Sequence, residues 1–234
     1  MCFIMERNTF LSRLLDLFYP PRCVWCHRFL IGKEKEEGVC RPCLTSLPVF
    51  SREKRQKNQP GLDSCISLLE YTGDVRQSIL RYKFNGLSFY CSVYANLVFS
   101  SLDQDEYACD LITWVPLSRK RLRSRGYDQA KLLSKEFAAR VGLPCEELLE
   151  KVRNTAPQSG TGSRAERKAN IKDAYRVKQE EKIAGKSILL IDDIVTTGAT
   201  LSECAQVLKA AGARQVRALT LARTDLQSLE MEKP

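Results

Sequence analysis

The sequence predicts an α/β protein, in which a mostly parallel sheet is flanked by helices, with a small cysteine-rich module before it. Two observations predict this fold. Short apolar segments alternate with segments of helical periodicity from Cys65 to Ala222, as in chains that wind helices around parallel strands. Two Cys-x-x-Cys pairs precede this region. At 234 residues, the chain is long enough for one medium domain and one small domain.

The composition divides the chain into four parts. We expect an N-terminal helix and cysteine module at 1–50, a basic linker at 51–62, the α/β domain at 63–226 and a C-terminal tail at 227–234. We predict the linker because the stretch after Phe50 has no apolar residues and contains four cations, Arg52, Lys54, Arg55 and Lys57. Such a stretch is typical of a solvated connection between modules.

The cysteine module is predicted to hold a structural zinc ion. Cys23 and Cys26 form one pair, Cys40 and Cys43 form the second, and 13 residues separate them. Two pairs at this spacing favour a four-thiolate zinc knuckle or ribbon over a redox dithiol. Four thiolates leave no open position for catalysis. His27 follows Cys26 and is the only histidine, so a histidine dyad or a His-rich metal site is excluded for this chain.

The remaining features of the N-terminal part indicate a cytoplasmic protein. Residues 10–18 have the apolar spacing of a short amphipathic helix that ends at Pro20–Pro21, and we expect it to pack on the protein itself, with membrane or partner contact as the alternative. No apolar run approaches the roughly 20 residues of a membrane span. The segment Met1–Met5 is too short for a signal peptide. The other cysteines are scattered singly, as small buried apolar residues are.

In the α/β domain, period-2 and continuous apolar runs predict strands, and 3.6-residue periodicity predicts helices. The expected strands are Ile66–Tyr71, Leu111–Val115, Ser187–Ile191 and Val216–Ala222, and the expected helical segments are Asp74–Phe84, Leu87–Leu102, Tyr127–Val141 and Leu201–Ala211. In a sheet of this class the ligand lies beyond the C-terminal ends of the strands.

The stretch that follows the strand Ser187–Ile191 predicts a phosphate site. Asp192 and Asp193 end the strand, and Thr196, Thr197, Gly198, Ala199 and Thr200 lead into a helix. Free N–H groups at a helix start, with the positive end of its dipole, attract phosphate, and glycine allows close approach. The carboxylates suit ribose hydroxyls or a Mg²⁺ ion carried by the ligand. The alternative is a buried strand with an acidic turn.

A basic cluster follows the strand Leu111–Val115. Five cations occupy the seven residues from Arg119 to Arg125. This density of charge suits a Mg²⁺-pyrophosphate group, and the alternatives are a solvated basic loop or a nucleic-acid patch. A longer stretch, 154–175, is rich in Ser, Gly, Thr, Arg and Lys. It is predicted to be a lid over the site, with disorder without function as the alternative.

The run from Ser187 to Thr200 resembles the signature of type I phosphoribosyltransferases, which bind 5-phosphoribosyl 1-pyrophosphate (PRPP) with Mg²⁺. The resemblance implies that Asp192 and Asp193 hold the ribose hydroxyls and that residues 196–200 hold the 5′-phosphate. It also implies that Leu117, Ser118 and Arg119 bind the pyrophosphate arm. Arg164 and Arg167 would then approach the diphosphate when the lid closes.

The order of features over nearly the whole chain resembles the ComF family of competence-associated, GntX-like proteins. The four-Cys module is followed by Arg125-Gly126-Tyr127-Asp128-Gln129-Ala130 and then by Thr155-Ala156-Pro157-Gln158. Where the family usually has Phe-Asn, this chain has Tyr127-Asp128. The resemblance implies a role in DNA uptake and natural transformation, with single-stranded DNA, a competence helicase and recombination proteins as partners. A net charge of +9 is compatible with phosphorylated ligands, nucleic acid or an acidic protein partner.

Three functions stay open at this level. The chain is a phosphoribosyltransferase that releases pyrophosphate, a PRPP- or nucleic-acid-binding module without chemistry, or an adaptor that docks a helicase through its zinc module. The sequence offers no dedicated general base and does not name an acceptor. Fold alone does not decide between catalysis and binding.

Overall fold

The computed structural model describes residues 18–153 and 171–224. The chain forms two compact units, Met1–Leu47 and Pro48–Pro234. The N-terminal unit contains two short helices, α2 (Glu34–Glu37) and α3 (Arg41–Ser46). Gly38 ends α2 in the left-handed conformation, and its N–H donates to the Glu34 carbonyl. The amphipathic helix expected at 10–18 lies outside the described residues except for its last position.

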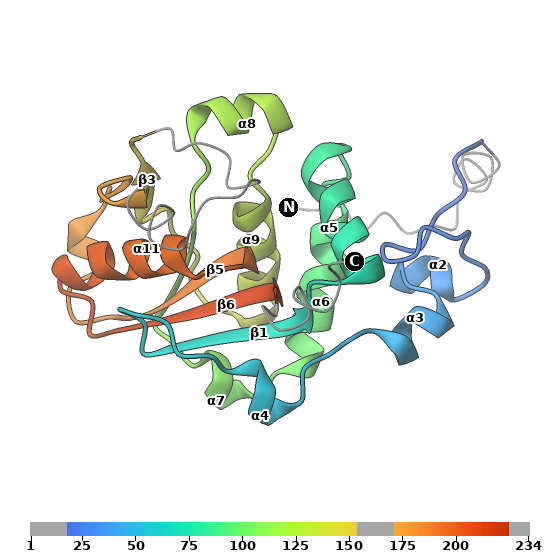
Figure 1. Cartoon of the computed structure of the whole chain (residues 1–234), viewed down its shortest axis with the longest axis horizontal. Coiled ribbons are helices and arrows are strands. Elements are labelled where there is room, and N and C mark those ends of the chain that lie inside the picture. The colour runs from blue at the N-terminus through green and yellow to red at the C-terminus, as the bar shows by residue number, and fades with distance from the viewer. Residues whose placement is uncertain (1–17, 154–170, 225–234) are drawn as a thin grey trace, which may run out of the picture. The chain divides into compact units, whose positions relative to one another are not determined.

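The larger unit is built on a four-stranded sheet, and Figure 1 shows its strands running side by side. The strands are β1 (Ser64–Glu70), β2 (Leu111–Trp114), β5 (Ser187–Val195) and β6 (Gln215–Arg223), in the order β1-β6-β5-β2. Every pair in this sheet is parallel, which confirms the predicted α/β fold class. The strand β5 continues four residues beyond the predicted end, so both acids lie within it.

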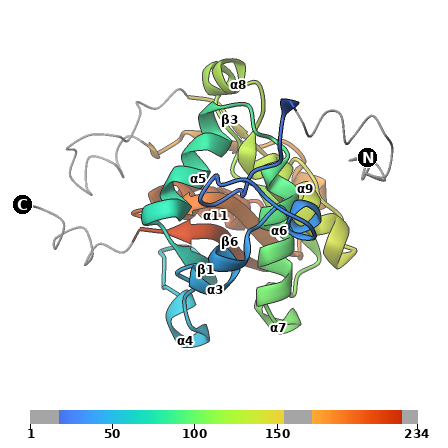
Figure 2. The same ribbon diagram turned by 90° about the vertical axis from the view of Figure 1, so that its right-hand side faces the viewer.

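Helices cover both faces of the sheet. The helix α9 (Gln129–Val141) packs on β2 and β5, and α6 (Tyr90–Ser101) packs against α9. The helix α11 (Ala199–Ala210) contacts β5 and β6. The helix α5 (Gly73–Phe84) follows β1 and, with α6, lies in front of the sheet in Figure 2. In Figure 1 β1 and β6 run toward the side on which α5 lies, so the C-terminal strand ends face this helix.

The basic cluster forms a helix where a loop was expected. Residues Arg119–Arg125 make α8, whose N-cap is Ser118 and whose C-cap is Gly126 at a φ of 80°. The Ser118 hydroxyl accepts from the Arg121 N–H, and the chain leaves the helix through the left-handed glycine. Because Arg and Lys are good helix formers, capping at both ends is enough to close two turns.

Two further short strands lie near the ends of the stretch 154–175, and the prediction of a lid is wrong for its described end, where Ile171, Ala174 and Tyr175 are buried in the core. The two strands are β3 (Leu149–Lys151) and β4 (Tyr175–Val177), which pair antiparallel, and the η1 turn (Glu180–Lys182) follows β4. Residues 154–170 between these strands lie outside the described part, together with Arg164 and Arg167.

The segment expected as a solvated linker is paired with the sheet. The short helix α4 (Arg52–Arg55) lies between two hydrogen bonds to β1. Before it the Phe50 N–H donates to the Leu68 carbonyl, and after it the Lys57 N–H donates to the Cys65 carbonyl. Bridges join Val49 to Leu69 and Gln56 to Ile66 in antiparallel sense. This segment therefore covers the free edge of β1, which protects an edge strand from pairing with another chain.

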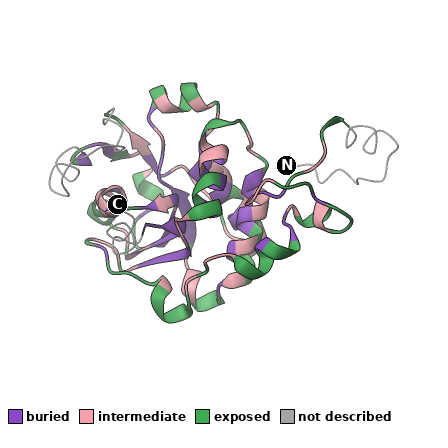
Figure 3. Ribbon diagram, turned by 45° about the vertical axis from the view of Figure 1, so that its right-hand side comes forward, coloured by how far each residue is buried: buried purple, intermediate pink, exposed green. Residues whose placement is uncertain are grey.

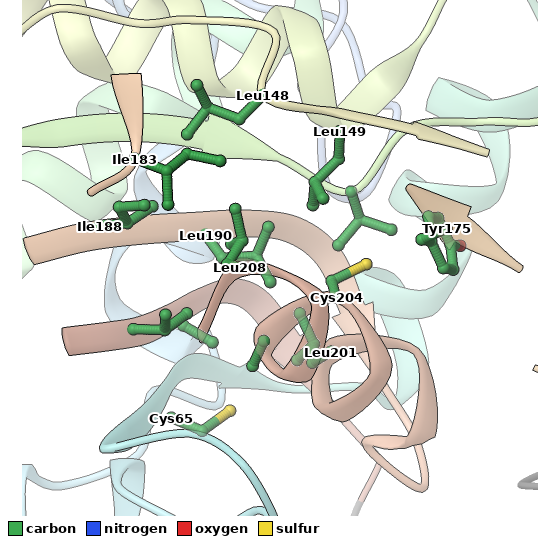
Figure 4. Close-up of a cluster of buried hydrophobic side chains, with 14 of the residues drawn as sticks. Cys65, Leu148, Leu149, Tyr175, Ile183, Ile188, Leu190, Leu201, Cys204 and Leu208 are labelled. Atoms are coloured by element: carbon green, nitrogen blue, oxygen red, sulfur yellow. The ribbon is translucent and has the colours of Figure 1, made fainter. Parts of the chain in front are cut away.

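The core lies on the two faces of the sheet, where buried residues concentrate in Figure 3. One cluster joins β5, β6 and α11 to the β3–β4 pair, and Figure 4 shows Leu190, Leu201, Cys204 and Leu208 within it. Of the scattered cysteines in the described part of the chain, Cys65, Cys91 and Cys204 are buried free thiols as predicted, whereas Cys109 and Cys145 are only half-buried. A further short helix, α7 (Gln104–Tyr107), precedes β2. Among the described residues no helix is both long enough and apolar enough to cross a membrane.

Candidate functional site

The four cysteines of the N-terminal unit converge on one point. The sulfur atoms of Cys23, Cys26, Cys40 and Cys43 all lie within 4.8 Å of one another. Sγ of Cys26 is 3.6 Å from Sγ of Cys40. A tetrahedral zinc ion with bonds of about 2.3 Å separates its sulfur ligands by about 3.8 Å, so this cluster has the dimensions of a closed zinc site. His27, with a positive φ of 65°, is outside the cluster.

The acid pair occupies the C-terminal part of β5. Asp193 is buried and Asp192 is half-buried. The Asp193 N–H donates to Oδ1 of Asp192 at 2.8 Å. Oδ2 of Asp193 is 3.0 Å from Nζ of Lys83, which comes from the last turn of α5. The sheet therefore brings two carboxylates to its C-terminal edge, and a helix supplies one cation to them.

The environment of the acid pair disfavours a full negative charge on Asp192. Burial raises its pKa to about 8, the neighbouring Asp193 charge acts in the same direction, and the Lys83 ammonium opposes both. A ligand that donates hydrogen bonds to the Asp192 carboxylate, or that brings a cation to it, would stabilise its ionised form. The pair is thus suited to vicinal hydroxyls or to a metal-bound polyol.

The Thr-rich segment leads from β5 into α11. Gly198 is the N-cap at a φ of 78° and has no side chain with which to cap the helix, while the Thr197 hydroxyl accepts from the Ala199 N–H at 3.5 Å. Thr196 is exposed, and Thr197, Ala199 and Thr200 are half-buried. The first N–H groups of a helix lack intrahelical acceptors, so these donors and the helix dipole favour an anion at this end.

Gly198 is also packed closely by a residue from the segment before β1. The Gln59 amide, only 8% exposed, lies where a Cβ on Gly198 would be. Its Oε1 is buried without a hydrogen-bond partner in the described part of the chain. Only glycine satisfies both the left-handed backbone and this contact at position 198.

The predicted pyrophosphate segment connects β2 to α8. Leu117 is half-buried, Ser118 is buried as the N-cap, and Arg119 is exposed at the start of the helix. The Leu117 N–H donates to Oδ2 of Asp128 at 2.9 Å. The other oxygen of Asp128 accepts from the Lys131 N–H at 3.1 Å and so caps α9. One buried carboxylate therefore fixes both this segment and the helix that follows.

Three residues near these segments were not assigned a role from the sequence. Lys83 lies on the polar side of the helix predicted at Asp74–Phe84, and nothing in its local sequence indicates an ion pair with Asp193. Gln59 stood in the expected linker, and no sequence signal points to its contact with Gly198. Asp128 had a detectable signal, because an Asp before an apolar helical run is a common N-cap.

Two family models match the chain. A double zinc ribbon domain matches residues 14–55, and a phosphoribosyl transferase domain matches residues 123–233. The first match spans the four-Cys cluster, and the second includes the acid pair and the Thr-rich segment. The matches agree with a zinc ribbon as the small unit and with a phosphoribosyltransferase fold for the larger unit.

Curated relatives extend over most of the chain. Competence protein F of Haemophilus influenzae is 26% identical over 88% of this chain and 98% of its own length. DNA utilization protein YhgH of Salmonella typhi is 30% identical over 79% of this chain and 78% of its own. Competence protein ComFC of Streptococcus pneumoniae is 32% identical, with 67% of each chain covered.

Solved structures overlap the chain only in part. An adenine phosphoribosyltransferase is 15% identical with a TM-score of 0.40, over 67% of this chain and 81% of that one. The glutamine PRPP amidotransferase from B. subtilis is 21% identical with a TM-score of 0.37, and it covers 58% of this chain, which spans only 26% of that enzyme. The family therefore rests on the sequence relatives: this chain, with its zinc ribbon and its phosphoribosyltransferase domain, belongs to the family of competence protein F, ComFC and YhgH.

Proposed function

We propose that the larger unit binds PRPP with Mg²⁺ at the C-terminal edge of its sheet, in the cytoplasm. The observation that carries the proposal is the continuous path from the Asp192–Asp193 pair to the N-terminus of α11, whose N-cap Gly198 has no side chain to cap the helix. Carboxylates next to a helix start with a glycine N-cap suit a ligand with hydroxyls at one end and a phosphate at the other. PRPP has this arrangement.

In this proposal each predicted segment takes one part of the ligand. Asp192 and Asp193 accept from the ribose hydroxyls. Thr196, Thr197, Gly198, Ala199 and Thr200 donate to the 5′-phosphate through main-chain N–H groups and hydroxyls. Leu117, Ser118 and Arg119 bind the Mg²⁺-diphosphate arm. Arg164 and Arg167 are proposed to meet the diphosphate from the segment outside the described residues.

Transfer of the phosphoribosyl group is the reaction class that this site would support. A nucleophile would attack the ribose C1 as its bond to the diphosphate oxygen breaks, and pyrophosphate would leave with its charge balanced by Mg²⁺ and nearby arginines. The acceptor would supply the nucleophile and lose a proton.

Calorimetry with PRPP and Mg²⁺, followed by an assay for released pyrophosphate, tests the proposal. We expect saturable binding that the Asp192→Asn/Asp193→Asn variant loses. Pyrophosphate release with a base or amine acceptor would establish an enzyme, and binding without release would establish a sensor. Affinity that the double substitution leaves unchanged would contradict the site.

A basic helix favours a second function, the binding of single-stranded nucleic acid. The residues of α8 are Arg-Lys-Arg-Leu-Arg-Ser-Arg, and most of them are exposed. Exposed cations on a helix suit a phosphate backbone, and their binding weakens steeply with salt. The relatives named for competence and DNA utilization agree with this role. We expect single-stranded DNA to bind with a strong salt slope that substitution of Lys120 and Arg123 by Gln reduces.

A further inference from the structure

The helix α5 contributes a cation to the acid pair. Lys83 lies one residue before the end of α5, and its Nζ is 3.0 Å from Oδ2 of Asp193. The Lys83 side chain is 17% exposed and that of Asp193 is 10% exposed, so this ion pair is largely shielded from water. An ion pair this buried is held in one geometry, unlike the mobile pairs on a protein surface.

The two acids point toward different sides of the sheet. Successive side chains of a strand alternate between its faces. Ile188 and Leu190 belong to the cluster that packs on α11, so Asp192 continues on that face and Asp193 points to the other one. Lys83 reaches Asp193 from α5. One acid of the pair is therefore held by a cation, and the other faces the helix start that follows it.

The end of α5 contacts the run Arg125–Gln129, which extends from the last residue of α8 to the first residue of α9. The Tyr82 hydroxyl donates to the Gln129 carbonyl at 2.9 Å, and the Tyr127 hydroxyl donates to the Tyr82 carbonyl. The Arg125 guanidinium lies 5.0 Å from the centre of the Phe84 ring and donates to Oε1 of Gln129 at 2.9 Å. These contacts involve the residues on both sides of Lys83, so its position does not depend on the ion pair alone.

The same segment also holds the predicted pyrophosphate loop. Asp128 lies between Tyr127 and Gln129 and accepts from the Leu117 N–H. The run from Arg125 to Gln129 thus fixes Leu117 on one side and Lys83 on the other. Because Lys83 forms an ion pair with Asp193, one connected set of contacts joins the ribose half of the proposed site to its diphosphate half.

We propose that Lys83 is a positioning residue of the phosphoribosyl site, which fixes the orientation and charge balance of the Asp193 carboxylate so that the acid pair accepts the ribose hydroxyls. This inference rests on the proposed function. Without the ammonium, two carboxylates joined in sequence would lie at a half-buried strand end with their repulsion uncompensated. Asp193 would then lose the contact that selects its rotamer, and hydroxyl acceptors that are displaced bind weakly.

The test compares three variants with the unaltered full chain. Lys83→Met removes the charge and keeps the length of the side chain, Lys83→Arg restores a cation, and Arg76→Met removes an exposed cation from the same helix as a control. Affinities for PRPP with Mg²⁺, for ribose 5-phosphate and for Mg²⁺-pyrophosphate are measured by calorimetry. Circular dichroism at the same temperature verifies that each variant is folded.

A positioning role predicts a specific pattern of losses. Lys83→Met should lower the affinity for PRPP and for ribose 5-phosphate by a similar factor, about tenfold or more, because the hydrogen bonds from the ribose hydroxyls to the charged carboxylate would be weakened. Its affinity for Mg²⁺-pyrophosphate, which has no ribose, should match that of the control. Lys83→Arg should recover most of the loss.

Three results would overturn the inference in distinguishable ways. If Lys83→Met binds PRPP as well as Arg76→Met does, Lys83 has no role in the site. A loss confined to PRPP and Mg²⁺-pyrophosphate would make Lys83 a direct diphosphate ligand instead. Should the unaltered protein bind neither PRPP nor ribose 5-phosphate, the proposed function itself fails and the inference fails with it.

Discussion

At the scale of single residues, Asp192 of the proposed ligand site lowers the stability of the unliganded protein. Its pKa is raised to about 8, first by burial and then by the charge of Asp193. The unfolded chain ionises this group near its ordinary pKa of about 4. Ionisation therefore favours the unfolded state increasingly from about pH 4 up to about pH 8, and Asp192 destabilises the unliganded protein at neutral pH.

Replacing Asp192 by Asn should consequently stabilise the unliganded protein while it weakens ligand binding. We expect a gain of roughly 1–3 kcal/mol at pH 8, the cost range of a poorly satisfied buried polar group, and little gain at pH 4. In the unaltered protein, PRPP affinity should rise between pH 6.5 and 8.5 as the carboxylate ionises. Urea denaturation and calorimetry across this pH range measure both effects. Equal stability of the two proteins at pH 8 would contradict the cost assigned to Asp192.

Gly198 is the second residue at which the chain has little freedom. An alanine there would adopt a left-handed φ and would overlap the Gln59 amide. We expect Gly198→Ala to cost more than the roughly 1 kcal/mol that the backbone strain alone imposes. It should also reduce PRPP affinity by displacing the start of α11.

Gly142→Ala provides the matched control for this substitution. Gly142 has a φ of 70°, and nothing lies within 4 Å of a Cβ built on it. Its substitution therefore carries the strain without the overlap. The difference between the two variants in chemical denaturation isolates the contact with Gln59, and the Gln59→Ala/Gly198→Ala double variant should recover part of it. Identical losses at both glycines would show that the overlap has no energetic weight.

At the scale of elements, Asp128 joins a helix start to the loop that precedes α8. Asp128→Ala removes the cap of α9 and the acceptor of the Leu117 N–H together, so we expect a loss of about 2 kcal/mol, more than the roughly 1 kcal/mol of an ordinary N-cap. Asp128→Asn retains one oxygen and should lose less. Asp103→Ala, which removes an exposed N-cap, is the control. The loss is measured by denaturation, and a cost for Asp128→Ala no larger than that of the control would contradict the double role.

The same scale shows what sequence patterns can and cannot specify. The four strands of the parallel sheet and the long helices were predictable within a few residues, because buried strands and amphipathic helices have periods that a linear sequence records. The strands β3 and β4 were not predicted, because three residues are too few to show a period. The helix α8 was not recognised, because it is two turns long and lacks an apolar face. The pairing of residues 49–57 with β1 depends on a free sheet edge, which exists only once the strand order is known.

The candidate site likewise has a part that the linear sequence records and a part that depends on the fold. The acid pair and the Thr-rich segment are contiguous in sequence, so the order of residues was enough to propose a phosphate site. Lys83 lies more than 100 residues from Asp193, and Gln59 is as far from Gly198. Contacts of this kind are made by tertiary packing, and a sequence without the fold carries no mark of them. The residues that a ligand would touch were thus more predictable than the residues that hold them.

At the scale of the whole molecule, the chain combines two units that are stabilised in different ways. The larger unit has a sheet with an apolar core on both faces. Among the described residues of the smaller unit, the only buried apolar side chains besides cysteines are those of Val24, Trp25, Leu30 and Val39, so we expect this unit to depend on its four-thiolate cluster for stability. Burial raises the pKa of Cys26 and of Cys43, and because zinc is bound by thiolates, zinc binding releases protons from these thiols.

Removal of zinc should therefore unfold the smaller unit and spare the larger one. We expect a strong chelator to release about one zinc ion per chain, and we expect Cys23→Ser to bind little zinc, with faster proteolysis before residue 48 in both cases. PRPP affinity should stay within about twofold, because the residues proposed to bind the ligand all belong to the larger unit. Cys65→Ser, a substitution of a buried thiol outside the cluster, should keep the zinc ion and serves as the control. Loss of PRPP binding in step with loss of zinc would show instead that the two units unfold as one cooperative structure, and the zinc ribbon would then be part of the ligand-binding machinery.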